Sequence, residues 1–148
     1  MIIVTGSAGF IGSCLVSELN YLGYHNLILV DDFSNQKKNK NLKNSKFHKK
    51  IDRNHFIDWF SNNYKDISFL FHLGARTDTS ELDTSIFEYL NLNYSKALYR
   101  ICVKFNIPFV YASSAATYGM GEFGFDDNHE KISSLLPLNP NAVYKNKF

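Results

Sequence analysis

The first twelve residues of the chain, MIIVTGSAGFIG, constrain its fold more than any other stretch. A short apolar run, Ile2 to Val4, is followed by Gly6, Gly9 and Gly12 at a constant spacing of three, and residues 13–22 are typical of a helix. A turn that joins strand to helix tightly and lets its backbone approach a pyrophosphate excludes a β-carbon at such positions. The first N–H groups of a helix lack intrahelical partners and carry partial positive charge. The sequence therefore predicts a strand, a glycine turn and a helix that together bind phosphate.

A second apolar run, Leu27 to Val30, ends in Asp31 and Asp32. Asp31 follows Gly12 by 19 residues, close to the roughly 20 at which a carboxylate meets the ribose hydroxyls of a dinucleotide. A tight turn followed by a surface aspartate is the purely structural explanation of the same residues. Because strand, turn, helix, second strand and acid occur in the expected order, we favour a dinucleotide-binding site.

Length and composition favour one globular domain, expected to span residues 1–148. Apolar residues make up 45% of the chain and charged residues 20%, which is ordinary for a soluble protein. The two cysteines, Cys14 and Cys102, have no metal-binding spacing, so we expect no metal site and a reducing, cytoplasmic setting. A charged start followed by a long apolar run is missing, so we expect neither a signal peptide nor a membrane span.

Residues 37–50, KKNKNLKNSKFHKK, hold seven lysines, and all 14 acidic residues of the chain lie elsewhere. Such a stretch can bind nucleic acid. It has one aromatic residue, Phe47, and neither helical nor strand periodicity. We therefore interpret it as a solvated loop and expect no nucleic-acid partner.

Predicted strands and helices alternate along the chain. Strands are expected at residues 27–31, 47–51, 67–73 and 107–112, and helices at residues 13–22, 55–64, 85–105 and from about 141 onward. This alternation predicts an α/β fold with right-handed crossovers and a doubly wound parallel sheet of the Rossmann type. Residues 67–73 are almost entirely apolar, so this strand should be central. Ligands of such sheets bind at the carboxyl ends of the strands, where Thr5, Asp31, residues 72–77 and Ser113–Ser114 lie.

The chain also contains the segments TGSAGFIG, FHLGA, NLNYS and YASSAATYG. Together they resemble the extended short-chain dehydrogenases, which include the NAD-dependent nucleotide-sugar epimerases and dehydratases, and the resemblance covers the whole chain. The segments FHLGARTDTSE, LNLNYSK and PLNP, with YASSAATYG, are most similar to the ADP-heptose epimerases of this family. An epimerase or dehydratase of another nucleotide sugar is the alternative.

This resemblance implies an isomerase that takes a hydride from C6″ of ADP-heptose onto a nicotinamide cofactor and returns it to the opposite face. The reaction would supply lipopolysaccharide core precursors. The resemblance further implies that the intact enzyme forms a homo-oligomer.

A set of cofactor-binding residues also follows from the resemblance. They are Gly6, Gly9, Phe10, Ile11 and Gly12 at the pyrophosphate, Asp31 and Asp32 at the adenosine ribose, Leu73, Gly74, Ala75, Arg76 and Thr77 along the cofactor, Asn91 in support of them, and Lys145 at the nicotinamide ribose. Lys38 and Arg53 match positions that neutralise a 2′-phosphate, which favours NADP, with NAD as the alternative. His72, which precedes the cofactor segment, is expected to be a core residue.

The same resemblance places Ser114 at the position of the catalytic serine, where its hydroxyl would bind the substrate oxygen. The family couples this serine to a Tyr-x-x-x-Lys motif, in which the lysine lowers the pKa of a phenol that is ordinarily near 10. Here Lys145 is present, but Asn141 stands at the tyrosine position, and an amide cannot carry the proton. Tyr144 lies near the same helix face and cannot replace that tyrosine, because its Cα is elsewhere.

Finally, the resemblance implies a substrate domain beyond Phe148, with the last strands of the sheet and the opposing base. We therefore expect an incomplete sheet that lacks the C-terminal substrate domain. Three functions remain open: an NADP-dependent ADP-heptose epimerase, an epimerase or dehydratase of another nucleotide sugar, and a catalytically inactive dinucleotide-binding fragment.

Overall fold

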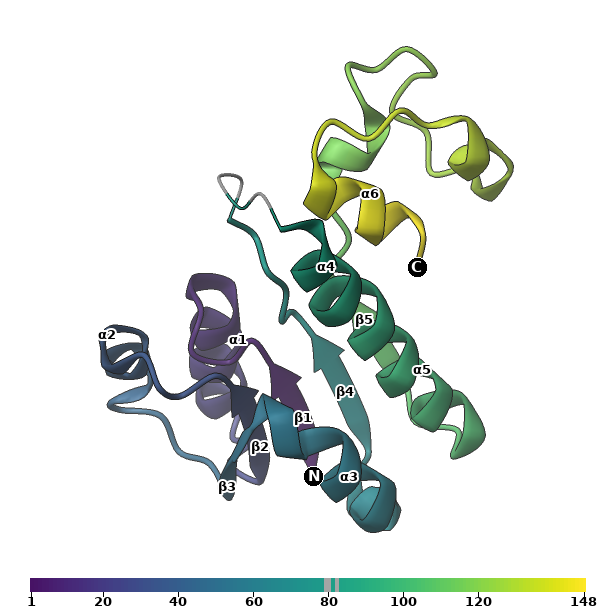
Figure 1. The fold of residues 1–148 in the computed structure, drawn as a ribbon. Coiled ribbons are helices and arrows are strands. Elements are labelled where there is room, and N and C mark those ends of the chain that lie inside the picture. The colour runs from purple at the N-terminus through teal and green to yellow at the C-terminus, as the bar shows by residue number, and fades with distance from the viewer. Residues whose placement is uncertain (79–80, 82) are drawn as a thin grey trace. The chain divides into compact units, whose positions relative to one another are not determined.

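The computed structural model describes residues 1–78, 81 and 83–148 (Figure 1). Thr79 and Ser80 of the segment FHLGARTDTSE lie outside the described residues. The chain divides into two compact units, and each is described by itself. The first comprises residues 1–74 and 97–111, and the second comprises residues 75–96 and 112–148.

The first unit is built around a parallel sheet. Its strands are β1 (Ile2–Thr5), β2 (Leu27–Asp31), β3 (Lys49–Asp52), β4 (Phe69–His72) and β5 (Phe109–Tyr111). Among the described residues they form one sheet in the order β3-β2-β1-β4-β5, and every neighbouring pair is parallel. This confirms the predicted doubly wound fold, and β4, between β1 and β5, is an inner strand as predicted. The outer strand β5 begins only after Pro108, which has no N–H to donate to a ladder.

The strand register brings polar residues to one edge of the sheet. Thr5 of β1 pairs with Val30 of β2 on one side and with His72 of β4 on the other. Asp31 pairs with Asp52 of β3. The carboxyl ends of four strands therefore place hydroxyl, carboxylate and imidazole groups along one edge, where ligands of parallel sheets bind.

Helices cover both faces of this sheet (Figure 1). The helices of the unit are α1 (Phe10–Tyr21), α2 (Gln36–Asn39), α3 (Arg53–Asn63) and residues 97–104 of α5 (Tyr94–Lys104). Val16 of α1 joins Val4 and Leu29 of the sheet in one buried cluster. Phe56 and Phe60 of α3 are fully buried and stack with ring centroids 5.4 Å apart. Each such side chain contributes roughly 1.5–3 kcal/mol of burial free energy, so both faces of the sheet are fixed by packing.

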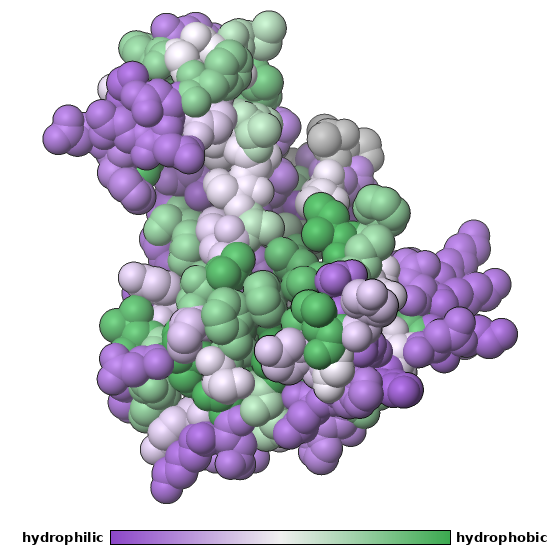
Figure 2. Space-filling model, turned by 180° about the vertical axis from the view of Figure 1, so that it is seen from behind, coloured by the Kyte–Doolittle hydropathy of each residue, from purple (hydrophilic) through white to green (hydrophobic). Residues whose placement is uncertain are grey.

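The lysine-rich stretch is not the plain loop that the sequence suggested. It contains α2 and a 3₁₀ turn, Lys40–Leu42. The Asn35 side chain starts α2 by accepting hydrogen bonds from the N–H groups of Lys37 and Lys38, and Leu42 is buried in the core. Hydrophilic side chains gather on the side of the molecule where α2 lies (Figure 2). The stretch is therefore an anchored segment with a solvated lysine surface.

The second unit is mainly helical. Its elements are α4 (Thr84–Phe87), a π-helical segment Glu88–Asn93, the first turn of α5, 3₁₀ turns at Ala115–Tyr118 and His129–Ser134, and α6 (Pro140–Asn146). The helix predicted over 85–105 is thus present as three consecutive segments. Helix α6 begins where the sequence predicted it, because Asn139 caps it by accepting a hydrogen bond of 2.9 Å from the N–H of Ala142 and Pro140 needs no partner for an N–H.

Candidate functional site

The glycine turn between β1 and α1 is too tight for side chains at two positions. Gly6 has φ +68°, and a β-carbon there would lie 2.7 Å from the backbone N of Gly74. A β-carbon on Gly12 would lie 2.0 Å from the carbonyl O of Gly6. Neither contact is possible, so the protein itself requires glycine at both positions.

Gly9 differs from the other two glycines. A β-carbon there would meet one protein atom within 4 Å, the carbonyl O of Gly6 at 3.2 Å. Gly9 immediately precedes α1. The first two side chains of this helix, Phe10 and Ile11, are 82% and 66% exposed. The first turn of α1 carries no acidic residue, so the partial positive charge of its N–H groups is not neutralised locally. The turn therefore presents an open, backbone-lined surface suited to an anion.

Asp31 ties the glycine turn to β2. Its side chain is 6% exposed, and both carboxylate oxygens are occupied within the protein. Oδ2 accepts a hydrogen bond of 2.8 Å from the N–H of Ala8, and Oδ1 accepts bonds from the N–H of Asp32 at 2.8 Å and from Nζ of Lys38 at 3.0 Å. Asp31 thus has a structural role in the turn, which the spacing to Gly12 did not reveal.

Asp32 is the more accessible of the two acids. Oδ1 accepts hydrogen bonds from the N–H and hydroxyl of Ser34, and Oδ2 accepts one of 3.2 Å from the guanidinium of Arg53. The bonds from Ser34, and then the charge of Arg53, hold the pKa of Asp32 below its ordinary value. Nε of Arg53 is buried and has no hydrogen-bond partner among the described residues. The carboxyl end of β2 therefore carries two carboxylate–cation pairs, Asp31 with Lys38 and Asp32 with Arg53.

His72 is a core residue, as the sequence analysis expected. Its side chain is fully buried, and Nδ1 lies 2.6 Å from the hydroxyl of Thr5. That hydroxyl also accepts a hydrogen bond of 3.2 Å from the N–H of Gly74. The interaction draws the segment after β4 against the glycine turn, and Leu73 donates its N–H to the carbonyl of Thr5 at 3.3 Å. The first two residues of the predicted cofactor segment therefore lie beside the predicted phosphate cradle.

The second unit holds the rest of that segment, Ala75, Arg76 and Thr77. Asn91 is fully buried in the π-helical segment and hydrogen-bonds to both the N–H and the carbonyl of Arg76. Its Oδ1 accepts from the Arg76 N–H at 2.7 Å, and its Nδ2 donates to the Arg76 carbonyl at 2.8 Å. The same Nδ2 donates to Oδ1 of Asn141 at 2.8 Å. Asn91 thus holds the predicted cofactor segment in place.

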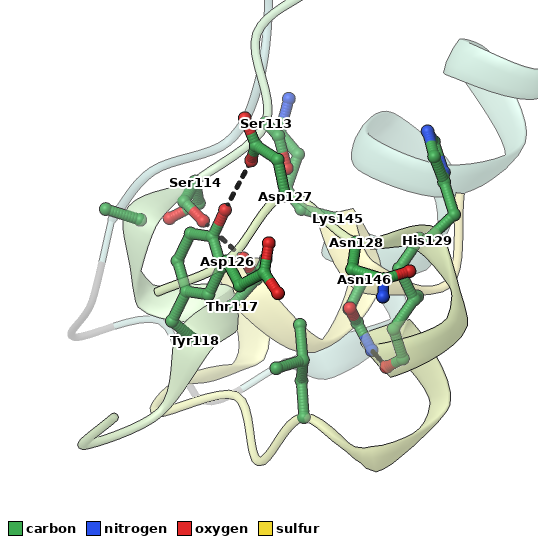
Figure 3. A pocket seen from close by; sticks show the side chains of 13 residues that line it. Ser113, Ser114, Thr117, Tyr118, Asp126, Asp127, Asn128, His129, Lys145 and Asn146 are labelled. Carbon is green, nitrogen blue, oxygen red and sulfur yellow. Dashed lines mark hydrogen bonds between the residues drawn. The ribbon is translucent and has the colours of Figure 1, made fainter. Parts of the chain in front are cut away.

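A pocket of about 500 Å³ in the second unit brings Ser114 and Lys145 together (Figure 3). The Ser114 hydroxyl accepts a hydrogen bond of 3.3 Å from the N–H of Ala116. Lys145 is 5% exposed, and its Nζ donates to the carbonyl of Ala112 at 2.6 Å. Burial lowers the pKa of Lys145 from 10.5 to about 8. The pocket therefore contains one hydroxyl and one buried amine from the predicted catalytic set.

The pocket also contains a phenol–carboxylate pair that sequence reasoning missed. The hydroxyl of Tyr118 donates to Oδ1 of Asp127 at 2.7 Å (Figure 3), and this bond raises the pKa of Tyr118. Tyr118 lies within the segment YASSAATYG, but the intervening turns hide its proximity to Asp127. Asn141, by contrast, is not among the described residues that line the pocket.

Two broader features bear on the class of protein. Among the described residues, no group of histidine, cysteine, aspartate and glutamate side chains is arranged to hold a metal ion. The helices of the described chain are all too short or too polar to cross a membrane.

Comparisons with known proteins agree with this arrangement. The chain is 39% identical to the ADP-L-glycero-D-manno-heptose-6-epimerase of Fusobacterium nucleatum and 43% identical to that of Brachyspira hyodysenteriae, over all of this chain and 46% of each relative. The crystal structure of UDP-glucuronic acid 4-epimerase from Bacillus cereus in complex with NAD matches with a TM-score of 0.75 and 26% identity, over 97% of this chain and 48% of that one. UDP-glucose 4-epimerase from Thermotoga maritima matches with a TM-score of 0.75 and 28% identity, over 99% of this chain and 48% of that one.

The chain spans about half the length of the curated relatives it matches. The model of the NAD dependent epimerase/dehydratase family matches residues 2–147, which is almost the entire chain. With a parallel sheet, a glycine turn at its edge and a serine–lysine pocket, the chain belongs to the NAD-dependent epimerase/dehydratase family.

Proposed function

We propose that this chain provides the cofactor-binding part of an NADP-dependent ADP-heptose 6-epimerase. The observation that carries this proposal is the glycine turn, where Gly6 and Gly12 exclude a β-carbon and Gly9 leaves an open surface at the start of α1. The identity of 39–43% to proteins named ADP-L-glycero-D-manno-heptose-6-epimerase supports this substrate over other nucleotide sugars.

The residues present fit a dinucleotide. The N–H groups of residues 10–12 would bind the pyrophosphate, since the N–H of Gly9 already donates to the carbonyl of Gly6 at 3.0 Å. The carboxylate of Asp32, which is 36% exposed, would accept hydrogen bonds from the adenosine ribose. Asp31 would act mainly through the turn, because its oxygens already have partners. The guanidinium of Arg53, whose side chain is 36% exposed, could also donate to a phosphate.

The pocket residues would serve the reacting end. A bound nicotinamide supplies reversible hydride acceptance, while the protein supplies orientation and hydrogen bonds. The Ser114 hydroxyl would donate a hydrogen bond to the oxygen on the reacting carbon. Lys145 would bind the nicotinamide ribose, because it lines the same pocket as Ser114.

Lys38 and Arg53 support NADP over NAD. Their side chains are 40% and 36% exposed, and both lie beside the acids at the end of β2. A 2′-phosphate could share these cations with the carboxylates through charge-assisted hydrogen bonds, each worth roughly 1.5–3 kcal/mol. NAD has an uncharged 2′-hydroxyl at this position, which gains less from two cations than a phosphate does.

We expect the chain to bind NADPH at least tenfold more tightly than NADH in a fluorescence titration. The double substitution Lys38→Met with Arg53→Met should weaken NADPH binding at least tenfold and change NADH binding less than threefold. Lys37→Met is the matched control, because Lys37 is exposed on the same helix and should leave both affinities unchanged. Equal or tighter binding of NADH would assign NAD as the cofactor, and no binding of either at millimolar concentration would reject the proposed function.

A catalytically inactive dinucleotide-binding module is the second candidate function. Asn141 favours it, because this amide stands at the position of the family's tyrosine and is hydrogen-bonded to Asn91 outside the pocket. Incubating the chain with NADP⁺ and one ADP-heptose epimer separates the two candidates. Appearance of the other epimer would establish the epimerase, whereas tight NADPH binding without turnover would establish the module.

A further inference from the structure

We infer that Asn141 is a positioning residue, which orders the cofactor segment 75–77 through Asn91. This inference deepens the proposed function and rests on it for the link to cofactor binding. Residue 141 would then have a positioning role in place of proton transfer, and the Tyr-x-x-x-Lys motif does not predict that role.

The hydrogen-bonding capacity of Asn91 makes Asn141 necessary. An asparagine amide nitrogen has two N–H donors. One donates to the Arg76 carbonyl and the other to Oδ1 of Asn141, both at 2.8 Å. Because Asn91 is fully buried, loss of the Asn141 oxygen would leave one buried N–H without its partner.

The orientation of Asn91 is what fixes Arg76. The Oδ1 of Asn91 accepts from the Arg76 N–H and its Nδ2 donates to the Arg76 carbonyl, so one side-chain amide binds both backbone groups of Arg76. Asn141 offers an acceptor to the same Nδ2 and thus favours this orientation over the reversed one. The backbone of Arg76 is therefore held by linked hydrogen bonds that run from Asn141 of α6 through Asn91 to Arg76.

Helix α6 carries both Asn141 and a residue that lines the pocket. Asn141 and Lys145 are four residues apart and lie on the same face of α6. Lys145 lines the pocket with Ser114, whereas Asn141 turns to the π-helical segment that carries Asn91. One helix thus sets the position of the buried amine at one end and of segment 75–77 at the other.

The chemistry of the contact defines the test. Asn141 contributes only an acceptor oxygen to Asn91, so Asn141→Asp keeps that oxygen while Asn141→Ala removes it. Tyr144→Phe is a control on the same helix, because Tyr144 does not line the pocket and a phenylalanine keeps its ring.

Two measurements on the full chain decide the inference. In the absence of cofactor, hydrogen exchange at the Arg76 N–H should be at least tenfold faster in Asn141→Ala, and within threefold of the original chain in Asn141→Asp and Tyr144→Phe. The dissociation constant for NADPH should rise about tenfold in Asn141→Ala and stay within threefold in the other two variants.

A purely structural role would give a different pattern. Asn141→Ala would then melt at a lower temperature but keep its Arg76 exchange rate and NADPH affinity well below that temperature, and this result would overturn the inference. If the original chain bound no NADPH, the proposed function would fail, while the exchange rates in the cofactor-free chain would still decide whether Asn141 orders segment 75–77.

Discussion

Gly12→Ala is expected to lower the free energy of unfolding by about 3 kcal/mol or more. The added β-carbon would lie 2.0 Å from the carbonyl O and 2.8 Å from the carbonyl C of Gly6. Both are backbone atoms of the turn, so relief requires a shift of α1 against β1, and overpacking of this kind costs about 1–3 kcal/mol or more. Urea denaturation followed by circular dichroism measures the change.

Gly9→Ala is the matched control for this prediction. Its β-carbon would approach the Gly6 carbonyl O at 3.2 Å, so the loss of stability should stay within about 1 kcal/mol. The methyl group would occupy the surface proposed for the pyrophosphate, so the dissociation constant for NADPH should rise at least tenfold. A Gly12→Ala variant as stable as the original chain, or a Gly9→Ala variant with unchanged affinity, would contradict this account of the turn.

Lys145→Met is expected to stabilise the chain at pH 7 while weakening cofactor binding. Burial lowers the pKa of Lys145 from 10.5 to about 8, and keeping the ammonium charged at pH 7 therefore costs about 3 kcal/mol. Removing the polar contacts of the ammonium, which include the hydrogen bond to Ala112, costs about 1 kcal/mol. The expected net gain is about 2 kcal/mol, measured by urea denaturation at pH 7.

The stabilisation expected from Lys145→Met depends on pH, because the folded and unfolded chains release the Lys145 proton at different pH values. Between pH 8 and 10.5 the unfolded chain holds a proton on Lys145 that the folded chain has released, so the contribution of this group to stability rises with pH. Below pH 8 its penalty is fully present. The advantage of Lys145→Met should therefore shrink as pH rises from 8 to 10.5, before base denaturation intervenes.

Lys147→Met serves as the control, because Lys147 is exposed at the end of the same helix. Its stability should stay within about 1 kcal/mol of the original chain at each pH. A Lys145→Met variant that is less stable at pH 7, or whose advantage does not fall with rising pH, would show that burial does not perturb this amine.

The sequence predicted the elements whose signals are local. Glycine spacing identified the β1–α1 turn, because the requirement at Gly12 comes from the nearby backbone of Gly6 and Ser7. The requirement at Gly6 comes instead from Leu73 and Gly74, a distant segment that the spacing did not reveal. The start of α1 was set three residues late, since Gly9 precedes the helix and Phe10 begins it. The stretch 37–50 lacks periodicity, and its helical turns depend on one capping residue, Asn35, and one buried residue, Leu42.

Contacts between distant residues could not be predicted from the sequence. Asn91 and Asn141 are 50 residues apart, and no periodic pattern connects them. Asp31 was expected at the ribose, but its bond to the Ala8 N–H depends on how the turn packs against β2. Ser114 and Lys145 lie in one pocket, as their match to the family motif implied, whereas the Tyr118–Asp127 pair in the same pocket had no such signal.

The central claim is that the phosphates of a dinucleotide bind at the start of α1. Amide NMR spectra of the ¹⁵N-labelled chain titrated with NADP⁺ test it most directly. We predict that the largest shifts occur at the N–H groups of Phe10, Ile11 and Gly12 and saturate with the dissociation constant measured by fluorescence. Shifts confined to the lysine-rich residues 37–50, or unchanged amides at residues 10–12 in a saturated sample, would contradict the account.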